Sequence, residues 1–174
     1  EVGDDSGKPI LVHNFYIPAG GDVPDRAENP KFGHKLDFLD ELAEWSERLR
    51  KDNADAVLVG DLNIAPFESD VWNHKALVKI VSHTPVECAA LNRIRDVGQW
   101  TDAIRQLVPE PNPLFTWWSY RSPDWDAADK GRRLDHIWVG ENLRSRIEAH
   151  AVRREARGWE KPSDHVPVAL TLGD

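Results

Sequence analysis

The segment LVGDLNIAP, residues 58–66, is an apolar run with an abrupt polar ending. Together with the residues just before it, the run DAVLVG (55–60) has the composition of a short buried strand. The run stops at Gly60, and an acid and an amide, Asp61 and Asn63, follow it. Because a strand that ends this way delivers its last side chains to a sheet edge, the segment predicts a sheet-based fold with a polar site at one edge.

Strand and helix patterns alternate along the rest of the chain. Apolar residues at helical spacing predict an amphipathic helix over 34–50. Thr84, Pro85 and Glu87 form a capping-box signature for a second helix, which is expected to end near Gly98. The other expected elements are a strand from residue 9 that runs into a long loop (20–33), a short helix over 101–108, and strands at 114–120, 134–139, 147–154 and 165–172. This order predicts the α/β class with a sheet-rich second half.

The bulk composition limits the class of protein. The 174 residues fit one domain, 1–174, large enough to bury a core. The chain has no run of 18 apolar residues, so no segment is expected to span a membrane. Cys88 is the only cysteine, which excludes an intramolecular disulfide and favours a reducing compartment, by default the cytoplasm.

The charge is unevenly distributed. A net charge of -8 argues against a generic nucleic-acid binder, which is usually basic. Residues 1–114 hold 12 basic and 20 acidic side chains, whereas residues 115–174 hold 10 of each, so the acidic excess lies in the first part. Two basic stretches, KGRR (130–133) and RREAR (153–157), form either a local surface for nucleic acid or an ordinary solvated face.

Three apolar strands are each flanked by an acid with a polar neighbour. A single Asp beside a strand is usually a turn residue. If the three strands lie side by side in one sheet, however, their edge residues converge on one patch of carboxylates, amide and imidazole. The acid and its polar neighbour at the three strands are Asp61 with Asn63, Asp135 with His136, and Asp164 with His165.

Such an oxygen-rich patch suits a hard divalent cation, Mg2+ before Zn2+, because the chain has no cysteine cluster and no HExxH motif. A bound cation of this kind favours phosphate esters as substrates. Tyr16, where the first strand enters its Pro and Gly loop, either donates to a phosphate or is a half-buried surface tyrosine. His165 has a potential carboxylate partner in Asp135, which would hold its imidazole in one tautomer.

Five segments together carry a family resemblance: NFYIPAG (14–20), GDLNIAP (60–66), TWWSYRS (116–122), GRRLDHIWV (131–139) and PSDHVPVAL (162–170). In this order they resemble the exonuclease III family of abasic-site endonucleases. That family belongs to the endonuclease/exonuclease/phosphatase superfamily, which includes deoxyribonuclease I and hydrolases of inositol phosphates and sphingomyelin. The resemblance implies a portion of a deoxyribonuclease I-like four-layer α/β sandwich, in which two packed mixed sheets are flanked by helices.

The resemblance also implies roles for single residues. Asp61 would activate the attacking water, Asn63 would hold the scissile phosphate and a metal, and Tyr16 would contact the phosphate. Asp135 would orient His165, which would bind a non-bridging oxygen. The implied catalytic residues are thus Tyr16, Asp61, Asn63, Asp135 and His165, and the implied metal ligands are Asp61, Asn63 and Asp164.

A pocket for an extruded baseless sugar is implied as well. Trp117 and Leu134 would wall it, and Trp118 would press on the duplex. Since neighbours on a strand face opposite sides, one of the two tryptophans is expected in the core. The full implied set is Trp117, Trp118, Tyr120, Arg121, Arg132 and Leu134. The chain departs from relatives at Ala19, where several carry an amide, and at Arg132, which is apolar in some.

The resemblance predicts a monomeric DNA-repair phosphodiesterase that uses Mg2+, with Mn2+ as a substitute. It would cut double-stranded DNA 5' to abasic sites and degrade 3' ends. Nothing before Pro9 matches the family's first strands, which bear an Asn and a Glu metal ligand, so the chain is expected to be the later portion of an enzyme and inactive alone. Two alternatives stay open: hydrolysis of inositol phosphates or phospholipid head groups, and a non-catalytic binding module.

Overall fold

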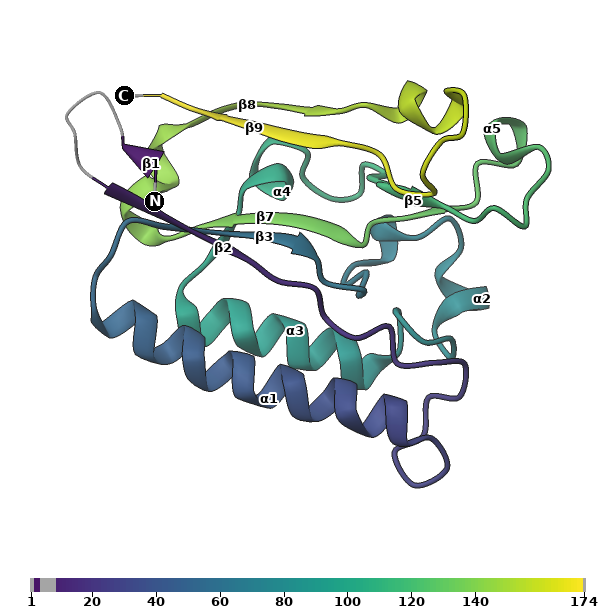
Figure 1. Cartoon of the computed structure of the whole chain (residues 1–174), viewed down its shortest axis with the longest axis horizontal. Coiled ribbons are helices and arrows are strands. Elements are labelled where there is room, and N and C mark those ends of the chain that lie inside the picture. Colours follow the sequence, from purple (N-terminus) through teal and green to yellow (C-terminus); the bar gives the residue numbers. More distant parts are fainter. Residues whose placement is uncertain (1, 4–8, 174) are drawn as a thin grey trace.

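The computed structural model describes residues 2–3 and 9–173. These residues form three layers (Figure 1): helices α1 and α3 cover one face of a central mixed sheet, and a two-stranded sheet of β8 and β9 covers the other. The α/β class predicted from the sequence is confirmed, and the second half is rich in strands as expected. No helix in the described part of the chain is long and apolar enough to cross a bilayer.

The central sheet has the strand order β1-β2-β3-β7-β4. Strands β2 and β3 are parallel, and the other neighbours are antiparallel. The strands of this sheet are β1 (Val2–Gly3), β2 (Pro9–Asn14), β3 (Ala56–Asp61), β4 (Thr101–Asp102) and β7 (Asp135–Val139). Two smaller sheets pair β5 (Trp117–Trp118) with β6 (Gly131–Arg132), and β8 (Ile147–Val152) with β9 (Val168–Leu172).

The three predicted helices are present, two of them with changed bounds, and the short helices at His74–Leu77 and Trp125–Ala128 were not predicted. The helix expected over 101–108 spans Ala103–Leu107, because residues 101–102 form β4. Helix α1 begins at Pro30 rather than at residue 34, because the Asn29 side chain accepts a hydrogen bond from the Lys31 amide and Pro30 suits the first helical turn. The loop expected over 20–33 therefore ends at residue 29. The helices are α1 (Pro30–Lys51), α2 (His74–Leu77), α3 (Pro85–Gly98), α4 (Ala103–Leu107) and α5 (Trp125–Ala128), with 3-10 turns at Glu68–Asp70, Glu141–Arg146 and Arg154–Gly158.

The predicted capping box of α3 is present. Thr84 caps the helix, and the Glu87 carboxylate accepts from the Thr84 amide in return. Glu87 also forms an ion pair with Lys35 of α1 at 2.6 Å, and both side chains are fully buried. A buried pair of this kind is costly to break from one side, so it fixes how the two helices pack.

Two apolar cores separate the three layers. The larger lies between the helices and the central sheet and includes Leu39 and Leu42 of α1, Leu91 and Ile94 of α3, and Leu58 of β3. The smaller core packs the opposite face of the sheet against β8 and β9. The first three residues of β3 are buried between the two cores, and its last three, 59–61, are half-buried where the site begins.

Candidate active site

The ends of β3 and β7 bring two carboxylates together. Asp61 and Asp135 are register partners in the antiparallel ladder. His165 joins them because its backbone bridges that of Trp117. One ligand atom from each of Asp61, Asp135 and His165 can be chosen so that all lie within 4.8 Å of one another. The predicted convergence is therefore present for these three residues, but only β3 and β7 are neighbours in one sheet. The strand expected over 165–172 spans Val168–Leu172 and lies in the separate sheet of β8 and β9, so the expectation of three adjacent strands is wrong.

Asp61 is held by a tight turn with Asn63. Asn63 has a positive φ of 52°, a conformation that asparagine tolerates better than most residues. Its amide donates to Asp61 Oδ1 at 2.9 Å, and its side-chain Nδ2 donates to Asp61 Oδ2 at 3.0 Å and to the Ile17 carbonyl at 2.9 Å. Lys35 in turn donates to the Asn63 carbonyl at 2.9 Å. The buried ion pair between the helices thus supports the backbone of the site.

The surroundings of Asp61 disfavour its ionised carboxylate. Burial raises the pKa of its carboxyl above the ordinary value, and the neighbouring charge of Asp135 acts in the same direction. The Asn63 amide and the imidazole of His165 oppose the shift. Two adjacent carboxylates in a half-buried site are stabilised when a cation binds between them.

Asp135 orients His165. The imidazole Nδ1 donates to Asp135 Oδ2 at 2.9 Å, and the Thr116 hydroxyl donates to the same oxygen at 2.6 Å. His165 Nε2 then faces Asp61 Oδ2 at 3.8 Å. Burial disfavours the charged imidazole, but the hydrogen bond to Asp135 and the surrounding carboxylates outweigh it and raise the pKa of His165. The ring is therefore placed to donate from Nε2 toward an anion beside Asp61.

Asp164 lies at the wall of the same site rather than within the three-residue cluster. Its Oδ2 accepts from the Trp117 indole at 2.9 Å, and its carbonyl accepts from the Trp118 amide at 2.9 Å. Tyr16, with 68% of its surface exposed, also lines the cavity. The implied roles of Asp164 as a metal ligand and of Tyr16 as a phosphate contact stay predictions.

The chemistry of these donors fits a hard cation. Asp61 and Asp135 offer carboxylate oxygens, and no hydrogen bond from the described residues engages Asn63 Oδ1. Carboxylate and amide oxygens are the ligands that Mg2+ prefers, and the absence of a thiolate from this set argues against a structural zinc site.

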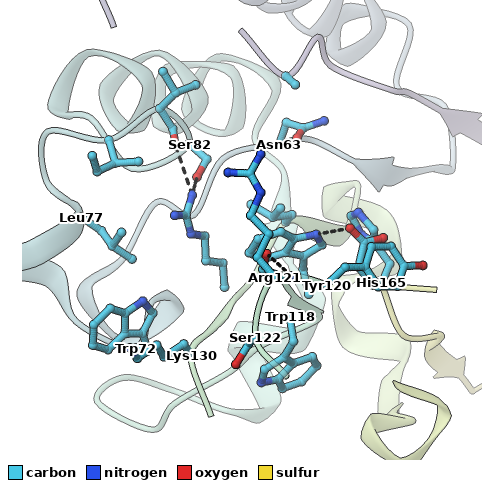
Figure 2. Close-up of a pocket in the computed structure, with 18 of the residues that line it drawn as sticks. Asn63, Trp72, Leu77, Ser82, Trp118, Tyr120, Arg121, Ser122, Lys130 and His165 are labelled. Carbon is cyan, nitrogen blue, oxygen red and sulfur yellow. Dashed lines mark hydrogen bonds between the residues drawn. The ribbon is translucent and has the colours of Figure 1, made fainter. Parts of the chain in front are cut away.

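A cavity of about 1000 Å3 opens beside the cluster (Figure 2). It reaches from His165 on one side to Trp72 and Leu77 on the other. Every predicted pocket residue lies along it, namely Trp117, Trp118, Tyr120, Arg121, Arg132 and Leu134. All six come from two short segments, 116–122 and 131–139, and their role in binding an abasic sugar stays a prediction.

The expected contact of Trp118 with a duplex is wrong. Only 2% of Trp118 is exposed, because its ring packs in a cluster with Ala156 and Val166 and its indole nitrogen donates to Asp129 at 2.9 Å. Trp117, its neighbour on β5, is only partly buried and faces the cavity. The expected split between the two tryptophans is therefore present, and packing places Trp118 in the core and Trp117 at the site.

Within the basic stretch 130–133, only part of the charge reaches the cavity. Lys130 and Arg132 line it, whereas Arg133 is buried and bonded to Asp70 and Asp102. In the second stretch, Arg154 pairs with Asp126 outside the cavity. Of the two stretches, only the first therefore brings positive charge to the cavity.

Three residues of the site were missed from the sequence. Thr116 anchors Asp135, Ser82 accepts from Arg132, and Trp72 closes the far end of the cavity with 38% of its surface exposed. Thr116 stood inside a quoted segment without a role. Ser82 and Trp72 lie in irregular segments, where no periodic pattern indicates which side chains face a cavity.

A mixed sheet with carboxylates, an amide and an imidazole at one edge is the arrangement expected of a metal-dependent phosphoesterase. Comparison with known proteins agrees with this class. The model of the Endonuclease/Exonuclease/phosphatase family matches residues 3–165, so the chain belongs to this family.

Among curated relatives, the chain is similar to Exodeoxyribonuclease III of Haemophilus influenzae, with 33% identity over 165 residues, covering 91% of this chain and 60% of the relative. It is also similar to Exodeoxyribonuclease of Bacillus subtilis, with 30% identity over 151 residues, covering 82% of this chain and 57% of the relative. The predicted resemblance to the exonuclease III family is thereby confirmed.

Solved structures agree. An AP endonuclease from Archaeoglobus fulgidus superposes with a TM-score of 0.86 at 28% identity, covering 94% of this chain and 61% of that chain. A 3' phosphatase from Neisseria, bound to product DNA hairpin, superposes with a TM-score of 0.85 at 29% identity and the same coverages, 94% and 61%. These neighbours confirm the predicted fold class. The chain spans about three fifths of the length of the relatives it matches.

Proposed function

We propose that the intact protein carrying this chain is a magnesium-dependent nuclease of DNA repair. It cuts the phosphodiester bond 5' to an abasic residue in double-stranded DNA and removes nucleotides from 3' ends. The observation that carries the proposal is the cluster of Asp61, Asp135 and His165, of which Asp61 and His165 line the same cavity as Trp117. Family membership and the names of the relatives support the same chemistry.

The residues of the cluster divide the work of in-line hydrolysis. Asp61, fixed by both amide groups of Asn63, accepts a proton from the attacking water. His165, oriented by Asp135, donates from Nε2 to a non-bridging oxygen of the phosphate. Tyr16, exposed beside them, contacts the phosphate or the leaving oxygen.

Asp61, Asn63 and Asp164 would hold the cation, with Mn2+ able to replace Mg2+. A bound divalent ion supplies charge neutralisation at the phosphate.

The cavity supports an abasic residue as the substrate. Trp117 and Leu134 present apolar surface to a sugar turned out of the duplex. Turning out a residue costs least where no base is stacked, which favours abasic sites over intact nucleotides. A monomer in the cytoplasm fits this activity, and the single cysteine supports a reducing compartment.

A head-to-head assay tests the substrate class. The intact protein is given an abasic duplex, a duplex with a 3' phosphate, inositol phosphates and phospholipid head groups at equal concentration with Mg2+. We expect cleavage of the abasic duplex to be fastest, and the isolated 174-residue chain to be inactive. Release of inorganic phosphate from the soluble phosphoesters without DNA cleavage would contradict the proposal and favour the other branch of the superfamily.

A further inference from the structure

Arg132, Trp117 and His165 form one cross-strand row along the cavity. Trp117 pairs with Arg132 across antiparallel β5 and β6, and with His165 through an isolated antiparallel bridge. Directly paired residues of antiparallel strands place their side chains on the same face, and all three line the cavity. Since neighbouring strands lie about 4.8 Å apart, the backbones of Arg132 and His165 are about 10 Å apart, one on each side of Trp117.

The Arg132 guanidinium is held by neutral oxygens. Its Nη1 donates to the Ser82 hydroxyl at 2.7 Å and to the Val81 carbonyl at 3.3 Å. The group also stands over the Trp117 ring, 5.5 Å from the centroid. Among the residues that the structure describes, no carboxylate forms an ion pair with Arg132, and no hydrogen bond engages its Nε or Nη2.

The next residue shows the opposite arrangement. Arg133 is neutralised within the fold, with bonds to Asp70 at 2.8 Å and Asp102 at 2.7 Å. For Arg132, burial lowers the pKa, and only the charge of Glu87 opposes the shift. A partly buried cation without an acidic contact is costly unless a ligand supplies the anion.

The cavity carries opposite charge at its two ends. Asp61 and His165 mark one end, while Lys130 joins Arg132 at the other and stands over the Trp72 ring, 5.0 Å from its centroid. In Figure 2, Ser82, Trp72 and Lys130 lie on the side of the cavity away from His165. If one phosphate of a nucleic-acid strand lies at Asp61 and His165, the next phosphate along that strand would lie toward the basic end of the cavity.

We propose that Arg132 binds the phosphate on the 3' side of the sugar that occupies the cavity. This rests on the proposed nuclease function, in which the scissile phosphate lies at Asp61 and His165 and the attached sugar lies against Trp117. The next phosphate of the same strand follows one sugar further, toward Arg132. Nε and Nη2, the two nitrogens without partners among the described residues, form the side of a guanidinium that binds two phosphate oxygens at once.

The test compares two abasic duplexes that differ only in the phosphate 3' to the abasic analogue, which in one of them is a neutral methylphosphonate. The intact protein, its Arg132→Gln variant and its Arg132→Lys variant are measured in single turnover with Mg2+. Arg48→Gln is the matched control, because Arg48 is an exposed arginine of α1 paired with Glu44. Thermal unfolding of each variant checks that the fold is retained.

We expect wild type to cleave the charged duplex about 10- to 100-fold faster than the neutral one, the range for a charge-assisted hydrogen bond. Arg132→Gln should lose the same factor on the charged duplex and less than about 3-fold more on the neutral one, because the two changes remove one interaction. Arg132→Lys should fall between them, and Arg48→Gln should match wild type on both duplexes.

If Arg132→Gln and the methylphosphonate each slow cleavage and their factors multiply when the two changes are combined, the assignment is overturned. If wild type cleaves neither duplex, the nuclease function itself is wrong and this proposal fails with it.

Discussion

Asp61 and Asp135 face each other as register partners at the ends of antiparallel strands β3 and β7. The Asn63 turn fixes the first carboxylate, and the Thr116 hydroxyl together with His165 fixes the second. Each acid thus has its own anchor, and Asp61 lines the cavity together with His165, which Asp135 orients. The following predictions test this division of roles and the parts of the fold that support it.

Replacing Asp61 by Asn should lower kcat of the intact protein by at least about 100- to 1000-fold, because the amide cannot accept a proton from the attacking water and is a weaker ligand for a cation. Steady-state cleavage of an abasic duplex measures this. Asp52→Asn is the control, since Asp52 is exposed at the end of α1. Equal activity of Asp61→Asn and wild type would remove Asp61 from the catalytic residues.

Asp135 and His165 should behave as one unit. Because Asp135 acts by orienting the imidazole, Asp135→Asn and His165→Gln should each lower kcat/KM, and the double variant should lie within about 3-fold of the worse single variant. Losses that multiply in the double variant would show that the two side chains act independently.

Asp70 should be a structural residue outside the reaction. Its buried carboxylate bonds to Arg133 and Arg105, so Asp70→Ala leaves two buried cations with lost partners and should lower the free energy of unfolding by about 3–5 kcal/mol. Denaturant titration measures this. Asp37→Ala, which breaks the exposed pair with Arg26, should cost less than about 1 kcal/mol. Similar losses for the two variants would contradict the assignment of Asp70.

His83 should make stability depend on pH. Burial lowers the pKa of His83, although the hydrogen bond to the Ala65 carbonyl opposes the shift. Below the ordinary value of 6.5, the unfolded chain therefore takes up a proton that the folded state resists, so stability falls as the pH falls, by up to about 1.4 kcal/mol per unit.

The corresponding experiment compares unfolding free energies of wild type and His83→Gln from about pH 5 to pH 7.5. The variant should lose part of the slope, whereas His34→Gln, a change at an exposed position of α1, should keep it. Parallel curves for wild type and His83→Gln would place the titration elsewhere.

Local signals in the sequence predicted much of the fold. The capping box at Thr84 and Glu87 specifies the start of α3 from neighbouring residues alone. The start of α1 was placed too late because apolar spacing begins only after the first turn, while the cap at Asn29 depends on one polar side chain. The capping residue and the apolar spacing thus indicate different first residues for α1, and helix ends are the least certain part of such a prediction.

The residues of the site likewise fall into those that the sequence could predict and those that it could not. Asp61 and Asp135 could be predicted because each stands beside an apolar strand, and the two strands are neighbours in one sheet. His165 precedes a strand of another sheet and reaches them through its bridge to Trp117. Ser82 and Trp72 could not be predicted, since their places in the cavity depend on irregular segments packed by long-range contacts. For Trp118, strand alternation left two assignments open, and only packing decided between them.

The most direct test of the central claim is metal-dependent cleavage of a duplex with one abasic analogue by the intact protein, with the product ends mapped. We predict one cut on the 5' side of the analogue in Mg2+, no cut in EDTA, and recovery when Mg2+ or Mn2+ is restored. A duplex that stays intact in Mg2+, or one that is cut equally well in EDTA, would contradict the account.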